Sequence, residues 1–377
     1  MQIAICIYKV FGYGGIPRDM FKIARESLSR GHKIRVYALR WLVEPTDEFD
    51  VVMVPVKAMA NHNLYKKYTA WVGQHLAENP VDLVLGMNKM PGLDVYYAGD
   101  SCYEEKSQEQ RTWLYRLTPR YKHFSEYEKA VFLPDKKTLV LTISDTEKPY
   151  FKKHYNTPEE RFAMLPPGIE RDRAGIEVSI TKVAEIRAEH QLADKDTLLV
   201  FIGSGFIKKG LDRLLLGIMK MPEPYKSQCK LLILGEDRTD AFERMVRRLG
   251  IGGQVEFLGG RDDVPDYLAA ADGMVLPAYD ENTGTVILEA VIAGVPVLTT
   301  ENCGYAHYVL ECNAGLVVPM PYSQEVFDVM LVELITSNMR QTWIENGRKL
   351  ANDERIYSLA QRAVDYIEQW QESRRQA

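Results

Sequence analysis

The sequence predicts an α/β protein with two doubly wound parallel sheets, and three observations support this. The chain has 377 residues, enough for two or three domains. Short apolar runs alternate with helix-length amphipathic segments along the chain, and a proline-rich turn divides these runs into two series. Hydrophobic residues make up 46% and charged residues 26%, which excludes a disordered chain, a collagen or a disulfide-stapled miniprotein.

The predicted strands are rich in β-branched residues and leucine and do not alternate between apolar and polar positions. Such strands are expected where helices cover both faces of a parallel sheet. In the first half they are residues 2–7, 33–38, 51–54, 82–86 and 138–144. In the second half they are residues 197–203, 230–235, 254–258, 274–277, 295–299 and 315–318.

The stretch Leu165-Pro166-Pro167-Gly168-Ile169 is the predicted hinge between two domains. Paired prolines fix extended backbone, and the glycine permits a bend. We therefore expect one domain at residues 1–166 and another at residues 167–355. An amphipathic helix starting at Leu359 closes the sequence, and the segment 356–377 is expected to pack back on the first domain.

Charge and cysteine content limit the class of protein. Lysine and arginine total 47 against 52 acidic residues, a net charge of -5 that argues against a nucleic-acid binder. The five cysteines have no CxxC spacing and are expected to be reduced thiols of a cytosolic protein. The first apolar run is too short for a signal peptide, and no stretch reaches the roughly 18 apolar residues of a membrane span. We expect a soluble protein, or one that binds a membrane surface.

The residues after the predicted strand that ends at Pro277 carry the clearest chemical signal. Glu281 lies on a loop, and Glu289 lies about one turn into a helix that begins near Gly284 and closes at Gly294. Backbone N–H groups at such a helix start attract an anion such as a diphosphate. Glu281 could bind the hydroxyls of a sugar, and Glu289 those of a ribose. A dipole-favoured acid before the helix and a solvated Glu289 would explain the pattern equally well.

Two further strand ends carry charged or glycine-rich turns. Lys208 and Lys209 open a helix, where cations are unfavourable without an anionic partner, so they could neutralise a diphosphate leaving group. They could also be solvated surface lysines. Arg261 follows another strand and could border a base-binding pocket, although an arginine–aspartate surface pair is the simpler interpretation.

The amino-terminal turn joins the first strand to the first helix through Gly14 and Gly15, and Asp19 in the first helical turn could bind hydroxyls. Its spacing does not fit GxGxxG, so NAD binding is not supported. Asp194-Lys195-Asp196 precedes a strand and is interpreted as a turn, not as a metal-holding DxD motif. No metal-ligand cluster and no GxSxG nucleophile elbow is present.

The Glu-x7-Glu pair, the Lys208-Lys209-Gly210 turn and the Gly14-Gly15-Ile16 loop together resemble the retaining glycosyltransferases of the GT-B fold, family 4. Residues 88–96, 165–169 and 303–308 resemble the bacterial lipopolysaccharide core glucosyltransferases of type I, and the likeness covers essentially the whole chain. The resemblance implies two Rossmann-like doubly wound domains facing a central cleft. The amino-terminal domain would bind the acceptor and the carboxy-terminal domain the nucleotide sugar.

The resemblance also implies an activity. A hexose, either glucose or a related hexose or N-acetylhexosamine, would pass from a UDP-sugar to an inner-core heptose of the lipid-linked oligosaccharide, with retention. No metal and no other cofactor would be required. The implied partners are the UDP-sugar, the acceptor and an anionic inner-membrane surface, without nucleic acid. The protein would be cytoplasmic and peripherally bound to the inner membrane, in lipopolysaccharide core and outer membrane biogenesis.

Residue roles follow from the resemblance by matching position. Lys209, Glu281 and Asp100 are the implied catalytic residues, and Lys209, assisted by Lys208, would stabilise the departing UDP. Glu281 would bind donor-sugar hydroxyls, Glu289 the ribose, and Arg261 would border the uridine. The implied phosphate and sugar ligands are the backbone N–H groups of Thr283, Gly284, Thr285 and Val286.

On the acceptor side of the cleft, the resemblance places the Gly14–Gly15 loop, Asp19 and Asp100, with Gly15 also counted among the donor-binding residues. This chain has Ser204 where many members have an arginine, so the phosphate clamp rests more heavily on lysine. It has Asp100 where many members have a histidine. His307 follows a strand and is interpreted as structural.

Between residues 111 and 125 the charge is one-sided, with four basic residues, no acidic residue and interleaved aromatic side chains. A cationic, aromatic-rich amphipathic segment suits an anionic membrane surface. Nucleic acid binding, or an ordinary helix packed on the domain, are the other interpretations. The expected membrane contacts are Arg111, Trp113, Arg116, Arg120 and Lys122.

Two other functions remain open at this point. A nucleotide-sugar epimerase shares a two-domain cleft, but it needs acid–base residues around the sugar that the motifs do not supply. A non-catalytic saccharide-binding protein on the same fold is the second alternative. The presence of Glu281, Glu289 and Lys209 argues against it.

Overall fold

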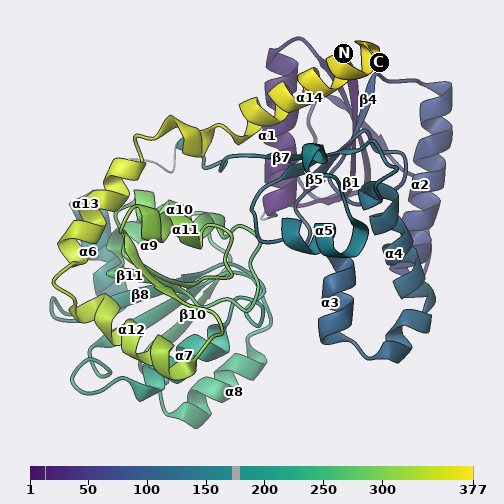
Figure 1. The fold of residues 1–377 in the computed structure, drawn as a ribbon. Helices are drawn as coiled ribbons and strands as arrows, with labels where there is room; N and C mark the ends of the chain where they lie inside the picture. Colours follow the sequence, from purple (N-terminus) through teal and green to yellow (C-terminus); the bar gives the residue numbers. More distant parts are fainter. Residues whose placement is uncertain (13, 172–178, 377) are drawn as a thin grey trace. The chain divides into compact units, whose positions relative to one another are not determined.

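The computed structural model describes residues 1–12, 14–171 and 179–376, and the chain folds into two compact units (Figure 1). Unit 1 comprises Met1–Gly168 and the segment from Ser358 onward, and unit 2 comprises Ile169–Tyr357. The first boundary lies after residue 168, where 166 was predicted, and the second after 357, where 355 was predicted. The chain therefore passes from unit 1 to unit 2 within the proline-rich turn.

Unit 1 contains a seven-stranded sheet in the order β3-β2-β1-β4-β5-β6-β7, in which every pairing is parallel. The strands are β1 (Gln2–Val10), β2 (Lys33–Trp41), β3 (Asp50–Met53), β4 (Leu83–Gly86), β5 (Val95–Ala98), β6 (Leu139–Thr142) and β7 (Phe162–Met164).

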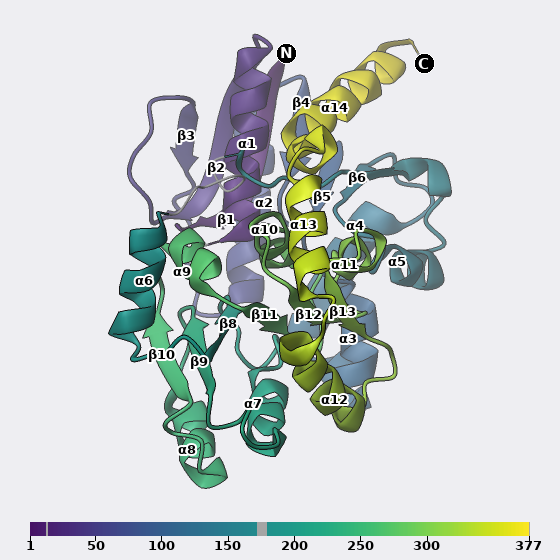
Figure 2. The same ribbon diagram turned by 90° about the vertical axis from the view of Figure 1, so that its left-hand side faces the viewer.

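Helices cover both faces of this sheet, because alternate residues of β1 belong to two different cores. Ile3 and Ile5 pack in one core with α1 and α14, whereas Ala4 and Cys6 pack in the other with α2, α4 and α5. Figure 2 shows α1 and α14 next to one another on the near side of the sheet. The helices of unit 1 are α1 (Gly15–Ser29), α2 (Asn61–Glu78), α3 (Tyr103–Gln110), η1 (Trp113–Leu117), α4 (Pro119–Phe132), α5 (Lys148–Tyr155), η2 (Glu159–Arg161) and α14 (Leu359–Gln376).

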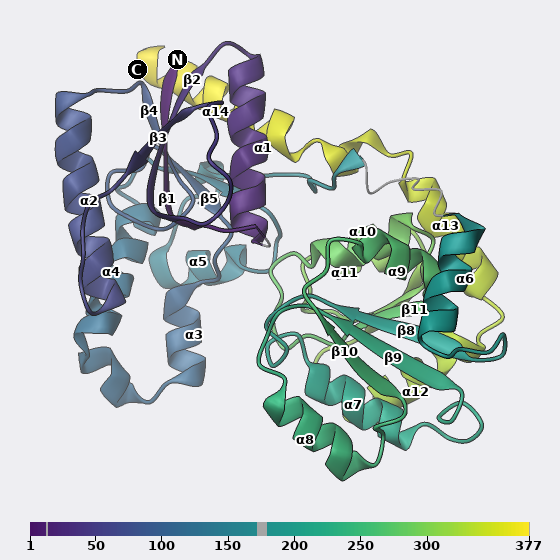
Figure 3. The ribbon, with the colours of Figure 1, turned by 180° about the vertical axis from the view of Figure 1, so that it is seen from behind.

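Unit 2 contains a six-stranded parallel sheet in the order β10-β9-β8-β11-β12-β13. Its strands are β8 (Thr197–Ile202), β9 (Cys229–Leu234), β10 (Val255–Gly259), β11 (Gly273–Leu276), β12 (Val297–Thr300) and β13 (Gly315–Val318). Figures 1 and 3 show α7, α8 and α12 on one side of this sheet and α9, α10 and α11 on the other. Its helices are α6 (Ile180–Glu189), α7 (Leu211–Lys220), α8 (Asp240–Leu249), α9 (Val264–Ala270), α10 (Thr285–Ile292), α11 (Ala306–Glu311), α12 (Gln324–Thr336), α13 (Arg340–Leu350) and η4 (Glu354–Tyr357).

In both sheets the first strand of the unit is central, and successive strands are added first on one side of it and then on the other. The order reverses between β1 and β4 in unit 1 and between β8 and β11 in unit 2. This is the strand order of doubly wound domains, which bind ligands at the carboxyl ends of the strands beside the reversal. The predicted fold class of two Rossmann-like α/β domains is confirmed. Each unit therefore has one geometrically defined place for a ligand.

All eleven predicted strands are present, but two further strands of unit 1 were missed. β5 is a four-residue run between Asp94 and Gly99, and β7 is a three-residue edge strand that pairs only with β6. The three residues of β7 give too little composition to predict a strand, whereas β5 is as long as several strands that were predicted, so its length does not explain why it was missed.

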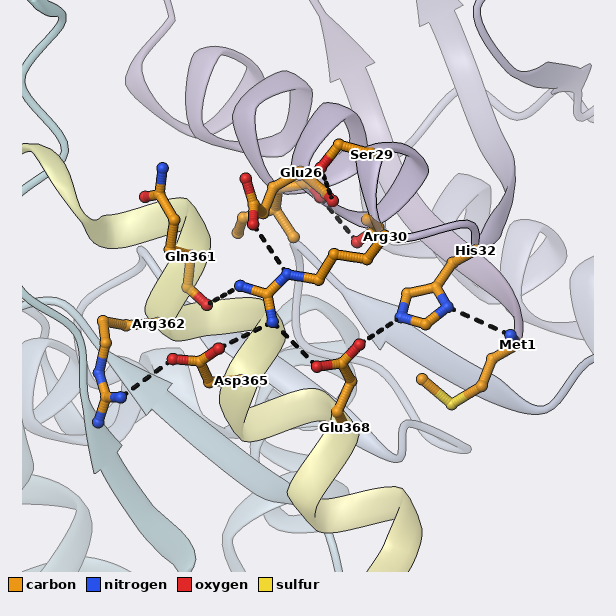
Figure 4. Close-up of polar contacts among 11 residues, drawn as sticks. Met1, Glu26, Ser29, Arg30, His32, Gln361, Arg362, Asp365 and Glu368 are labelled. Carbon is orange, nitrogen blue, oxygen red and sulfur yellow. Dashed lines mark hydrogen bonds and ion pairs between the residues drawn. The ribbon is translucent and has the colours of Figure 1, made fainter.

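The last helix packs on the first domain, as expected, and one arginine joins it to α1 (Figure 4). Arg30, which follows α1, donates from Nε to Glu26 at 2.8 Å and from Nη1 to Asp365 and Glu368 of α14 at 2.8 and 2.9 Å. Its Nη2 donates to the carbonyl oxygen of Gln361 at 3.1 Å. A single guanidinium therefore compensates three carboxylates, two of which belong to the returning helix.

None of the described helices combines the length and the apolar character needed to cross a membrane.

The Arg30→Ala variant tests whether this guanidinium fixes α14. We expect the free energy of unfolding to fall by about 1–3 kcal/mol, because neighbouring carboxylates lose their charge-assisted hydrogen bonds. Urea denaturation measures the loss, and hydrogen exchange should accelerate in α14. The control is Arg25→Ala, which removes an exposed pair with Glu48 and should cost about 0–1 kcal/mol. Equal losses in the two variants would show that the network does not hold the helix.

Candidate active site

The candidate active site of unit 2 lies where the winding of its sheet reverses. β8 and β11 are neighbours in the sheet. The turn from Gly203 to Gly210 follows β8, and the loop from Pro277 to Gly284 follows β11. Because parallel neighbours end at the same edge, these two connections meet there. They carry the lysines and the first glutamate that the sequence predicted as functional.

Lys209 and Glu281 form an ion pair across this edge. Lys209 Nζ donates to Glu281 Oε2 at 2.5 Å, and the two side chains are only 16% and 15% exposed. The lysine passes over Gly203, where a Cβ atom would lie 2.8 Å from Lys209 Cε. Gly203 thus leaves the space that the lysine needs. The structure brings together two of the three residues predicted to be catalytic.

A tight contact between Gly210 and Pro277 sets the separation of the two connections. Gly210 has φ +75, and a Cβ atom at this position would lie 2.0 Å from the carbonyl oxygen of Pro277. Next to this contact, the backbone N–H of Tyr279 donates to the carbonyl oxygen of Lys208 at 2.8 Å. The turn 203–210, which carries Lys209 (the lysine turn), and the loop 277–284, which carries Glu281 (the glutamate loop), are therefore joined through their backbones.

A third connection, between β12 and α11, completes the edge. Glu281 forms an isolated parallel bridge with Cys303, and the N–H of Gly304 donates to the carbonyl oxygen of Glu281 at 2.9 Å. The N–H of Tyr305 donates to Thr283 in the same way at 2.8 Å. Sequence reasoning used these residues only as points of resemblance. Their position after the strand next to β11 was the signal that could have placed them here.

The predicted helix start is confirmed at α10. Gly284 is its N-cap, with φ +76, and Thr285 is the first helical residue. Glu289 lies one turn further and is half-buried, so it is not on a fully solvated face. The backbone N–H groups of this first turn follow Glu281 within a few residues. They therefore lie at the same strand edge as the Lys209–Glu281 pair.

Two predicted cations are less tightly held. Lys208 Nζ lies 3.8 Å from Asp280 Oδ2, and its side chain is 48% exposed. Arg261, after β10, donates from Nε and Nη2 to Asp263 at 2.6 Å each and lies over the ring of Tyr267. The simpler interpretation of Arg261 as half of an arginine–aspartate pair therefore describes its contacts, and its place beside a uridine stays a prediction.

In unit 1, Asp19 and Gly15 lie on α1 and Asp100 follows β5. Asp19 is 9% exposed and accepts a hydrogen bond from the Tyr97 hydroxyl at 2.6 Å. Burial raises the pKa of Asp19, although Arg18 and Tyr97 oppose the shift. Asp100 and Gly15 are exposed. The acceptor roles predicted for Asp19 and Asp100, and the donor contact of Gly15, stay predictions.

A buried charge cluster behind Asp100 was not foreseen. Glu128 of α4 is 0% exposed and accepts from Lys89 Nζ at 2.6 Å, and it also accepts from the backbone N–H groups of Tyr103 and Glu104 at the start of α3. Lys89 also donates to the Ser101 carbonyl oxygen at 2.7 Å. Burial alone would lower the pKa of Lys89, but the charges of Glu128 and Asp100 outweigh it and raise the pKa. The cluster fixes the loop after β5 and the start of α3.

The basic segment, residues 111–125, connects α3 to α4 and continues into α4. Figures 1 and 3 show α3 and α4 running out from unit 1, with the connection between them at the tip, and this connection contains η1. Trp113, Leu114 and Leu117 are 72%, 55% and 63% exposed, whereas Tyr121 and Phe124 pack against Tyr103. Pro119 is the first residue of α4, so the apolar positions before and after it do not form one stripe. The predicted basic contacts are all exposed: Arg111, Arg116, Arg120 and Lys122.

The surroundings of His307, of residues 193–196 and of the cysteines fit structural roles. His307 Nδ1 contacts the Gly304 carbonyl oxygen at 2.9 Å, which agrees with a structural role. Residues 193–196 form a turn, since Ala193 N–H donates to the Asp196 side chain. All five cysteines are free, and burial raises the pKa of Cys6 and Cys229 to about 12. Among the described residues, no group of three or more histidine, cysteine or acidic side chains could hold a metal ion.

Comparison with known proteins defines the class of this protein. The family model of glycosyl transferases group 1 matches residues 182–350, which are most of unit 2. The lipopolysaccharide glucosyltransferase WaaG of Escherichia coli K12 is 43% identical over 369 residues, which cover 97% of this chain and 98% of WaaG. A crystal structure of WaaG superimposes with a TM-score of 0.91 at 42% identity, covering 97% of this chain and 99% of that one.

The fold, the strand-end site and these likenesses define a glycosyltransferase. Within that class the chain belongs to the WaaG family of lipopolysaccharide glucosyltransferases. The fold is more widespread: Anabaena HepE in complex with UDP-glucose has a TM-score of 0.74 at 19% identity, covering 98% of this chain and 100% of that one. Membership of a transferase family argues against the epimerase alternative, which was supported only by a two-domain cleft of the same kind.

The Gly210→Ala variant tests the contact between the two connections. Its methyl group would both strain a left-handed residue and collide with Pro277, so we expect a loss of about 2–5 kcal/mol in unfolding free energy and a loss of transferase activity. The matched control is Gly250→Ala, because Gly250 also has positive φ, +67, but open space around its Cβ position. It should cost only about 1–2 kcal/mol. Urea denaturation of both variants decides, and equal costs would rule out the contact as a constraint.

Proposed function

We propose that this protein transfers a hexose from a UDP-sugar to an inner-core heptose of lipopolysaccharide, with retention at the anomeric carbon and without a metal ion. The observation that carries the proposal is the Lys209–Glu281 pair at the reversal point of the unit 2 sheet, in a chain of the WaaG family. A cation and a carboxylate at one strand edge match the two needs of a nucleotide-sugar donor, which has an anionic diphosphate and a hydroxyl-rich ring.

The proposed step is a displacement on one face of the donor. The bond between an acceptor hydroxyl oxygen and the anomeric carbon forms, and the bond from that carbon to the UDP oxygen breaks. The acceptor proton passes to the departing phosphate. Lys209 stabilises the charge that develops on this phosphate, with help from the more exposed Lys208. The N–H groups of Thr283, Gly284, Thr285 and Val286 bind the distal phosphate and sugar.

The other donor contacts follow from the same arrangement. Binding a diphosphate at Lys209 frees the Glu281 carboxylate to accept hydrogen bonds from the donor-sugar hydroxyls. Glu289, half-buried on α10, binds the ribose. Arg261 borders the uridine. The donor and acceptor contacts of Gly15, Asp19 and Asp100 of unit 1 rest on the family resemblance alone. Glucose is the first choice of donor because it is the sugar in the name of the 43% identical relative.

UDP release tests this function directly. Purified protein is incubated with isolated core acceptor and with UDP-glucose, UDP-galactose, UDP-N-acetylglucosamine or UDP-N-acetylgalactosamine. We expect release of UDP with one preferred donor and a hexose-sized mass gain on the acceptor. Conversion of the donor without UDP release would indicate an epimerase, and no change in either molecule would indicate a binding protein. Both outcomes would refute the proposal.

The Lys209→Ala variant should lower kcat by about 10²–10³-fold while changing donor affinity much less, because the lysine acts on charge that develops in the transition state. Lys220→Ala is the control, since Lys220 forms an exposed pair with Asp328 at the other end of α7. Steady-state kinetics of UDP release measures both. Near-normal turnover in Lys209→Ala would refute its role as leaving-group stabiliser.

We further propose that the basic segment binds the anionic cytoplasmic face of the inner membrane, where a lipid-linked acceptor would lie. Three exposed apolar side chains at its tip, Trp113, Leu114 and Leu117, stand among four exposed cations. Apolar insertion together with attraction to anionic lipids is the usual basis of peripheral binding. The Glu128–Lys89 cluster at the base of α3 and α4 would keep this tip in a fixed orientation relative to the unit 1 sheet.

Vesicle binding tests this second proposal. Replacing Arg116, Arg120 and Lys122 together by glutamine should weaken binding to anionic vesicles by about 100-fold, since each cation near the surface contributes about 1 kcal/mol. Binding of the wild type should also fall with added salt. The charge-matched control replaces the exposed Arg244, Arg247 and Arg248 of α8 by glutamine. Indistinguishable binding of the two triple variants would contradict the assignment of the membrane-facing side.

A further inference from the structure

Arg213, the third residue of α7, is a buried cation that no step of the proposed reaction uses. It is 9% exposed. Its Nη1 donates to the carbonyl oxygens of Pro277 and Ala278, both at 3.0 Å. Its guanidinium carbon lies 3.5 Å from the ring centroid of Tyr279 and 3.7 Å from that of Tyr322. Among the described residues, no carboxylate forms a salt bridge with it.

These contacts join the two segments that carry the Lys209–Glu281 pair. Arg213 lies four residues after Lys209, on the helix that the lysine turn opens. Pro277 and Ala278 are the first residues of the loop that leads to Glu281. The same loop is held from other sides as well: the Tyr279 hydroxyl donates to Asp212 at 2.8 Å, and Asn302 Nδ2 donates to the Tyr279 carbonyl oxygen at 2.5 Å.

The chemistry of the contact favours arginine over lysine. A planar guanidinium can donate to two adjacent carbonyl oxygens while its faces pack on aromatic rings, whereas an ammonium is a compact point charge with a strongly held hydration shell. A buried charge without an ionised partner costs stability. Backbone carbonyl dipoles and aromatic rings offset this cost for Arg213. All of these partners lie in the loop after β11, except Tyr322, which lies between β13 and α12.

We propose that Arg213 is a positioning residue for the active site: it fixes the height of the glutamate loop relative to the lysine turn, so that Glu281 and Lys209 stand at hydrogen-bonding distance. It contacts neither the sugar nor the phosphate. The catalytic meaning of this inference rests on the proposed function, because that function gives the pair its role. The structural part, the fixation of the loop, does not depend on it.

The conservative variant Arg213→Lys tests the inference, because the lysine keeps the charge but cannot reproduce both hydrogen bonds and the ring contacts. We expect amide hydrogen exchange to accelerate in the peptide covering residues 278–281. We also expect kcat of UDP release to fall by about 10- to 100-fold, with a smaller change in the KM of the donor, because displaced catalytic groups lose mainly transition-state stabilisation.

Arg187→Lys is the matched control. Arg187 also braces backbone carbonyl oxygens of unit 2, those of Asp196 at 2.6 Å and Ala270 at 3.4 Å, but it does so at the amino ends of β8 and β11. It should therefore lose a similar amount of stability without faster exchange at 278–281 and with nearly normal kcat. Tyr322→Leu, which removes one ring and leaves the hydrogen bonds in place, should shift exchange and kcat in the same direction as Arg213→Lys, but less.

The two readouts separate this inference from the proposed function. Unchanged exchange at 278–281 in Arg213→Lys, compared with Arg187→Lys, would overturn the positioning role whatever the enzyme does. Faster exchange with a kcat equal to that of the control would overturn its catalytic consequence. Faster exchange in a protein whose wild type releases no UDP from any donor would support the fixation of the loop and refute the proposed function instead.

Discussion

The meeting of two backbone segments at the reversal point of the unit 2 sheet is the constraint on which the candidate site depends. Gly210 comes so close to the carbonyl oxygen of Pro277 that no side chain fits between them. This contact and the hydrogen bond from Tyr279 to Lys208 hold the two backbone segments close together. The Lys209 and Glu281 side chains that these segments carry then lie within hydrogen-bonding distance.

The same principle operates in unit 1 with charges in place of a glycine. Glu128 is fully buried, and it accepts hydrogen bonds from one ammonium group, from the Tyr155 hydroxyl and from the backbone N–H groups that begin α3. Such a carboxylate cannot move without leaving donors unpaired, so it ties the exposed tip of the basic segment to the sheet. The Arg30 network does the same for α14 at the surface. In each case one charged side chain serves several partners that lie far apart in the sequence.

The residues that form the core and the residues with proposed binding roles thus lie in different parts of each unit. Apolar side chains of both sheets are covered on each face, which explains why strand-like runs without alternation were a sound guide. The residues with proposed roles in binding a donor or a membrane lie after strand ends, in connections or in the first two turns of helices, where side chains can differ without loss of the core.

The sequence by itself determined the α/β class, the position of the hinge, all six strands of unit 2, and the helix start at Gly284, because apolar periodicity, proline and glycine act locally. It also singled out Lys209 and Glu281, because cations are unfavourable at a helix start without an anionic partner, and because Glu281 belongs to a Glu-x7-Glu pair that carries a family resemblance. It did not determine β5 and β7, the pairing of Lys209 with Glu281, the burial of Asp19 against Tyr97, or the roles of Glu128 and Arg213. Those depend on which strands are neighbours and on contacts between residues tens of positions apart, and only the tertiary structure brings such residues together.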